Sequence, residues 1–121
     1  MFDGARRVTL SFGEIDPSAI ASLSPGERAQ VQLIDVREPN EWVGELGHIP
    51  GTTLLPLADF LIGGPPPGTD PARPVVLVCR SGQRSARAAA ALAYFGHPAP
   101  YNLTGGMIAW NQAGLEVTRE R

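Results

Sequence analysis

The sequence predicts an α/β fold in which helices pack against a mainly parallel sheet. Short apolar runs alternate along the chain with segments of helical pattern, which is typical of this class. The run Val75–Val78 is apolar and rich in β-branched residues, as expected for a central parallel strand. Residues 85–95 are rich in alanine and are followed by Gly96 and Pro98, which predicts a helix and its end.

Composition and charge narrow the class of protein. The chain has 121 residues, enough for one domain, and its 43% hydrophobic and 18% charged residues predict a folded globular chain. A net charge of −2 argues against a general nucleic-acid binder, and the apolar runs are too short to cross a membrane. Arg6 and Arg7 precede no apolar stretch, so we expect no secretory signal and a cytoplasmic protein.

The residue types present exclude several kinds of catalysis. Cys79 is the sole cysteine, which excludes an internal disulfide, a CxxC redox pair and a cysteine-rich zinc cluster. Every basic residue is an arginine, so Schiff-base chemistry, lysine-bound pyridoxal phosphate and a Walker-type phosphate loop are excluded as well. The two histidines, His48 and His97, lie far apart in the sequence.

The elements expected before the central strand follow from local patterns. Asp16 and Pro17 predict a helix start, and residues 24–26 predict its end. The expected elements are a strand end at Ile15, a helix over 16–23, a strand over 31–36, a brief helix over 39–46, a turn over 47–51, a short apolar run over 53–55 and a helical turn or two over 57–62.

Residues 63–74 are rich in glycine and proline and predict a surface loop. Its Gly-Pro-Pro-Pro-Gly segment, residues 64–68, has the composition of a phosphate loop, but prolines lack the N–H groups that such a loop needs. We interpret the segment as a connector. After the helix over 85–95 we expect a strand over 99–103, a glycine turn and a helix over 108–112.

Cys79 stands at the end of the central strand, before a tight loop that leads into the helix. Ligands of open α/β sheets bind at this carboxyl edge, where loop N–H groups and the helix start favour anions. This positive potential should stabilise a thiolate. Arg80 and Arg84 add charge, and Gly82 permits a tight turn. The alternative is a buried, inert core cysteine, but such a cysteine needs no arginines beside it.

Four segments resemble, in the same order, motifs of the rhodanese family of sulfurtransferases. The segments are Leu-Ile-Asp-Val-Arg-Glu-Pro over 33–39 with Glu41 and Trp42, Gly-His-Ile-Pro-Gly over 47–51 with Leu-Leu-Pro-Leu over 54–57, Cys-Arg-Ser-Gly-Gln-Arg-Ser over 79–85, and Leu-Thr-Gly-Gly-Met-Ile-Ala-Trp over 103–110. The first dozen residues and the proline-rich loop match least. The resemblance covers roughly residues 14–115, and we expect residues 1–121 to form a single domain with this core.

The resemblance implies a rhodanese-like, five-stranded, mostly parallel sheet with helices on both faces. It implies that Cys79 takes a sulfur atom from thiosulfate or a related donor, and that cyanide or a thiol removes it. Neither step needs a metal or an organic cofactor. The substrate-binding residues implied are those of the active-site loop: Arg80, Ser81, Gly82, Gln83, Arg84 and Ser85.

The length of the loop separates this chemistry from that of related phosphatases and arsenate reductases. Those enzymes place five residues between cysteine and arginine, whereas Cys79 and Arg84 have four between them. A shorter ring suits one sulfur atom better than a phosphoryl group. Two readings of the same loop stay open: an enzyme that uses small donors, and a carrier loaded by a protein partner such as a cysteine desulfurase. The presence of Cys79 weakens a third, a catalytically silent domain.

Five further residues are candidates for supporting roles. Asp35 is expected to be an acceptor for a loop N–H or for an arginine such as Arg84, with a general base as the alternative. Arg37 fits either the surface or the rim of the site. His48 is expected to brace its turn rather than to catalyse. Gly105 and Gly106 permit a close approach to the active loop.

Overall fold

Five parallel strands form one sheet in the order β1-β5-β4-β2-β3 in the computed structural model, which describes residues 11–121. The strands are β1 (Gly13–Ile15), β2 (Gln32–Asp35), β3 (Thr53–Leu54), β4 (Val75–Val78) and β5 (Pro100–Leu103). The five-stranded parallel sheet expected from the sequence is confirmed. The first ten residues, on which the expectation about a secretory signal depends, lie outside the described part of the chain.

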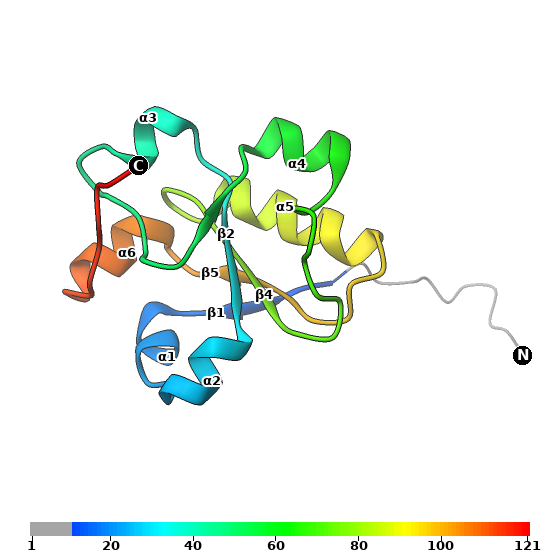
Figure 1. The fold of residues 1–121 in the computed structure, drawn as a ribbon, viewed down its shortest axis with the longest axis horizontal. Coiled ribbons are helices and arrows are strands. Elements are labelled where there is room, and N and C mark those ends of the chain that lie inside the picture. Colours follow the sequence, from blue (N-terminus) through cyan, green and yellow to red (C-terminus); the bar gives the residue numbers. More distant parts are fainter. Residues whose placement is uncertain (1–10) are drawn as a thin grey trace, which may run out of the picture.

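Helices cover both faces of the sheet, as expected (Figure 1). α4 and α5 pack on one face, and α1 and α6 pack on the other. The helices are α1 (Pro17–Ala21), α2 (Pro25–Gln30), α3 (Pro39–Trp42), α4 (Leu57–Gly63), α5 (Gln83–Tyr94) and α6 (Gly106–Gln112). None of the helices in residues 11–121 has the length and apolar character needed to cross a bilayer.

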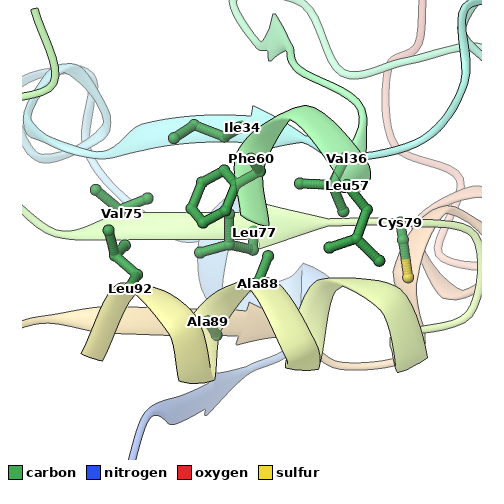
Figure 2. Close-up of a cluster of buried hydrophobic side chains, with 10 residues drawn as sticks. All are labelled: Ile34, Val36, Leu57, Phe60, Val75, Leu77, Cys79, Ala88, Ala89 and Leu92. Atoms are coloured by element: carbon green, nitrogen blue, oxygen red, sulfur yellow. The ribbon is translucent and has the colours of Figure 1, made fainter. Parts of the chain in front are cut away.

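β4 is the central strand and is buried on both faces. Val75 and Leu77 point toward α4 and α5 together with Cys79, the residue after the strand (Figure 2). Val76 and Val78 point to the opposite cluster, beneath α1 and α6. A parallel strand with both faces covered has no solvent-facing side, which explains its unbroken apolar sequence.

Several boundaries differ from the sequence-based expectation: α3 ends at Trp42 rather than at residue 46, and α6 begins at Gly106 rather than at residue 108. Residues 24–26, expected to end a helix, instead begin α2. The Ser24 hydroxyl accepts a hydrogen bond from the Glu27 N–H, and the Glu27 carboxylate accepts one from the Ser24 N–H, a reciprocal cap that starts a helix. α5 begins at Gln83 rather than at Ser85, because Gly82 in a left-handed conformation turns the loop directly into the helix.

The start of α6 lies against the loop that follows β4. The Met107 N–H donates to the Cys79 carbonyl at 2.9 Å, and the Ile108 N–H donates to the Arg80 carbonyl at 3.0 Å. This approach depends on Gly106, which has φ +59°. A Cβ there would lie 2.4 Å from the Cys79 carbonyl oxygen. The close approach expected at the glycine pair is therefore present.

We expect Gly106→Ala to destabilise the protein by about 2 kcal/mol or more, because it adds backbone strain and a clash with the loop. Urea unfolding followed by circular dichroism measures this. Gly26→Ala is the matched control, since a Cβ at Gly26 meets nothing within 4 Å; it should be neutral or slightly stabilising. Equal stability of the two variants would contradict the packing described.

Candidate active site

The Cys79 sulfur lies at the carboxyl end of β4, beside the first turn of α5 (Figure 2). Cys79 is 1% exposed. Its Sγ accepts a hydrogen bond from the Gly82 N–H at 3.1 Å and lies 3.2 Å from the Ser85 hydroxyl, a second donor. The sulfur is thus shielded from bulk water and surrounded by donors.

These surroundings decide the charge state of the thiol. Burial raises the pKa of Cys79, because it disfavours the charged form. Hydrogen bonds from the Ser85 side chain and from the backbone N–H groups of Ser85, Gly82 and Ser81 act in the opposite direction. The hydrogen bonds prevail, and the pKa of Cys79 lies below its ordinary value of 9.0. The site therefore stabilises the thiolate, the nucleophilic form of cysteine, more than water does.

The direction of the loop carbonyls fixes the direction of the N–H groups that follow them, among them that of Ser81, which helps to lower the pKa of Cys79. The carbonyls of Cys79 and Arg80 point toward α6 and accept its first N–H groups. The Gly82 carbonyl accepts a hydrogen bond from Asn102 Nδ2 at 3.1 Å. In a planar trans peptide the N–H points opposite to the preceding C=O. Binding the carbonyls on the outside therefore turns the N–H groups of the loop away from α6 and Asn102.

Arg84 is held by a carboxylate from α3. Its two terminal nitrogens donate to the two oxygens of Glu41 at 2.7 and 2.8 Å. Such bidentate hydrogen bonds between charged groups are stronger than those between neutral groups. The hydrogen bonds from Arg84 lower the pKa of Glu41 to about 2, and those to Glu41 raise the pKa of Arg84. The arginine of the loop is thus paired with Glu41 and not with Asp35, the partner suggested by the sequence.

Asp35 instead pairs with Arg37, and both are buried. Asp35 accepts hydrogen bonds from the Arg37 backbone N–H at 3.0 Å and from its guanidinium at 2.8–3.1 Å. The guanidinium also donates to the carbonyls of Glu41 and Gly47. Asp35 is therefore an acceptor for an arginine, as expected, but both the guanidinium and the N–H that it binds belong to Arg37 and not to the active loop. Arg37, left open between surface and rim, is 1% exposed and so is not a surface residue, and it lines the cleft described next.

A cleft of about 210 Å³ opens between α3 and the loop after Cys79. Its lining residues are Arg37, Asn40, Glu41, Gly44, Glu45, Leu46 and Arg80. Arg80 is exposed, and its guanidinium has no ion-pair partner among residues 11–121. Arg80 therefore places a positive charge without an ion-pair partner at the edge of this cleft, which the carboxylate residue Glu45 also lines.

His48 braces its turn and does not contact the active loop in the described residues. Its Nδ1 lies 2.7 Å from the Trp42 carbonyl, and its ring stacks on the Trp42 indole at 3.4 Å. Its backbone forms an antiparallel bridge with Thr118. These contacts fit the expectation of a structural histidine.

Two residues beside the loop carry contacts that sequence reasoning did not assign. Glu41 is part of a family motif but received no role, and Asn102 was not singled out. A polar residue between Tyr101 and Leu103 in an apolar strand was the available signal for Asn102, which is 4% exposed. The remaining loop residues, Ser81 and Gln83, are exposed.

Comparisons with known proteins agree with this geometry. The rhodanese-like domain family matches residues 19–113. The chain is 38% identical over 104 residues to a sulfurtransferase of Allochromatium vinosum, covering 86% of this chain and 92% of that protein. It is 39% identical over 90 residues to the thiosulfate sulfurtransferase GlpE of Shewanella oneidensis, covering 72% of this chain and 82% of that protein. The chain belongs to the rhodanese-like family, a family of sulfurtransferases.

A solved structure supports the fold as well. The rhodanese-like domain protein from Staphylococcus aureus is similar with a TM-score of 0.68 and 29% identity, over 88% of this chain and 99% of that one. Other relatives are longer: the chain spans 61% of the Bacillus subtilis protein YqhL, to which it is 44% identical over 81 residues, covering 67% of this chain.

The Glu41–Arg84 pair gives a stability prediction with a defined pH range. The pKa of Glu41 falls from 4.5 when unfolded to about 2 when folded, so its contribution is present above pH 4.5 and is lost as the pH falls toward 2. We expect Glu41→Gln to cost about 1 kcal/mol at pH 7, since the pair is partly exposed. Urea unfolding of both proteins from pH 7 to pH 2 measures this. A difference that stayed constant with pH would contradict the ion pair.

Proposed function

We propose that this protein transfers a sulfane sulfur from thiosulfate or a related donor to cyanide or a thiol, through a persulfide on Cys79. One observation carries the proposal: the Cys79 sulfur lies at a strand end among loop N–H groups and the Ser85 hydroxyl. These donors stabilise a thiolate, and the same donors suit a persulfide, which also carries negative charge.

The reaction consists of two displacements at sulfur. The Cys79 thiolate attacks the outer sulfur of thiosulfate, so that a new S–S bond forms while the bond to the sulfonate sulfur breaks. Its electron pair leaves with sulfite. Cyanide or a thiolate then attacks the terminal sulfur of the persulfide, which forms thiocyanate or a new persulfide and returns the Cys79 thiolate. Electrons balance in each step, so no external oxidant or reductant is required.

The two loop arginines have different proposed roles. Arg84 is neutralised by Glu41, so its part is to hold the loop against α3 rather than to attract the donor, the role first expected for it. Arg80 keeps an exposed charge beside the cleft and attracts the anionic donor. The amides of the loop, with Ser85, cradle the transferred sulfur.

The names of the relatives support a sulfur donor of this kind. The Shewanella relative is a thiosulfate sulfurtransferase, and the Allochromatium relative is a sulfurtransferase. A relative from Mycobacterium tuberculosis, MoeZ, is a probable adenylyltransferase/sulfurtransferase, and this chain spans 20% of its length. Sulfur transfer between protein partners is therefore the alternative to small-donor turnover, with the same cysteine.

Intact-protein mass spectrometry after incubation with thiosulfate tests the persulfide. We expect the wild type to gain the mass of one sulfur atom, and cyanide to remove it. Cys79→Ser is nearly isosteric and is expected to fold but to gain nothing, because it lacks the thiolate. Circular dichroism of the variant serves as the folding control.

Two outcomes of that experiment would contradict the proposal. A sulfur atom gained by Cys79→Ser would place the chemistry elsewhere. No gain with thiosulfate, polysulfide or other small donors would refute small-donor turnover and favour loading by a protein partner.

Arg80→Ala tests the source of donor affinity. We expect the KM for thiosulfate to rise about fivefold with little change in kcat, because one exposed charge is worth about 1 kcal/mol. The effect should shrink as ionic strength rises. Arg87→Ala removes an equally exposed arginine from α5 and should leave the KM unchanged. Equal effects of the two variants would show that net charge, and not Arg80, attracts the donor.

A further inference from the structure

Asn102 in β5 is a buried polar residue whose side chain forms hydrogen bonds with the Gly82 carbonyl and the Ser85 hydroxyl. It is 4% exposed and lies next to Leu103, which is fully buried. An apolar residue would fill such a strand position without the free-energy cost of burying an amide. The polar side chain must therefore find partners, and two of them, Gly82 and Ser85, lie in the segment that follows Cys79.

The hydrogen bonds of Asn102 fix the orientation of its amide. Nδ2 faces the Gly82 carbonyl at 3.1 Å and the two carboxylate oxygens of Glu14 at 3.2 and 3.3 Å. All three are acceptors, so the NH₂ group must be on this side. Oδ1 then faces the Ser85 hydroxyl, 2.5 Å away.

Each end of the amide acts on a group that surrounds the sulfur. The Gly82 carbonyl accepts from Asn102 and from the Ala86 N–H of α5, at 3.2 Å, and together these bonds hold the backbone of the residue whose own N–H donates to the sulfur. Binding of the Ser85 hydroxyl holds Oγ within 3.2 Å of Cys79 Sγ. Glu14, from β1, secures the amide from outside, and the Thr104 hydroxyl donates to the same carboxylate at 2.7 Å.

We propose that Asn102 is the positioning residue of the active loop, fixing the Gly82 peptide and the Ser85 hydroxyl around the sulfur of Cys79. It touches neither the sulfur nor the donor and acts through these two groups. This inference rests on the proposed sulfur transfer where turnover is concerned, but the environment of the thiol can be tested without it.

The test compares Asn102→Ala and Asn102→Leu with the wild type in two measurements. The first is the pH dependence of Cys79 alkylation by iodoacetamide, which reports the thiol pKa. The second is the rate of sulfur loading from thiosulfate. Asn102→Leu keeps the branching of the side chain and leaves no cavity, so an effect common to both variants does not arise from a cavity.

We expect the midpoint of alkylation to move to higher pH in both variants, because the donors around the thiolate lose their order. We expect kcat to fall about tenfold, as for the loss of one hydrogen bond to a charged group, with KM nearly unchanged because Arg80 is untouched. Thr104→Val is the matched control: it removes a contact of Glu14 without touching the loop and should alter neither measurement.

Three results would overturn the inference. Unchanged alkylation and kinetics, with lower stability alone, would make Asn102 merely structural. A midpoint moved to lower pH would mean that Asn102 competes with the sulfur for the single proton of Ser85. If neither variant folds, Glu14→Ala takes their place, because Glu14 is exposed. We expect it to raise the alkylation midpoint by less and to lower kcat about threefold. No change in either measurement would refute the proposal. Failure of the wild type to load sulfur would refute the proposed function and leave the alkylation result standing.

Discussion

The geometry of the site depends on one constraint: the carbonyl groups of the loop after β4 are bound from the outside. The first amides of α6 bind the carbonyls of Cys79 and Arg80, and Gly106 allows α6 to come this close. Because each peptide N–H points opposite to the preceding carbonyl, the loop then has donors directed away from α6. The hydrogen bonds around the sulfur lower the pKa of this buried cysteine, where burial alone would raise it.

A second set of contacts fixes the side of the site that faces α3. The buried pair of Asp35 and Arg37 joins the end of β2 to the carbonyl of Glu41, whose carboxylate in turn holds Arg84 on the loop. Breaking a buried pair leaves an uncompensated charge, which is costly. Asp35, Arg37 and Glu41 thus connect the sheet to the loop. Glu41 neutralises the charge of Arg84, whereas Arg80 keeps its charge.

Most of the fold could be predicted from the sequence because its signals are local. The apolar run of β4 and the alanine-rich pattern of α5 each depend on neighbours in the chain. The start of α2 could also have been predicted from local sequence, since Ser24 and Glu27 form a capping box. It was not, because the Ser-Pro-Gly segment has the composition of a helix end. The family motifs indicated Cys79 and its loop for a similar reason: they are contiguous.

The partners of the site residues could not be predicted in the same way. Arg84 and Glu41 are 43 positions apart, and Asn102 and Glu14 are 88 positions apart. No periodicity connects such residues; the order of the strands in the sheet brings them together. For Arg84 the sequence suggested Asp35, and the bidentate geometry that selects Glu41 exists only in the folded chain.

The most direct test of this account is the rate of Cys79 alkylation by iodoacetamide across pH, measured on the folded protein and on the chain unfolded in urea. Because Cys79 is the sole cysteine, the reaction reports one site without labelling ambiguity. The account predicts that the midpoint for the folded protein lies below that of the unfolded chain, since the loop donors outweigh burial. A midpoint equal to or above that of the unfolded chain would contradict it, and would make Cys79 an ordinary buried thiol.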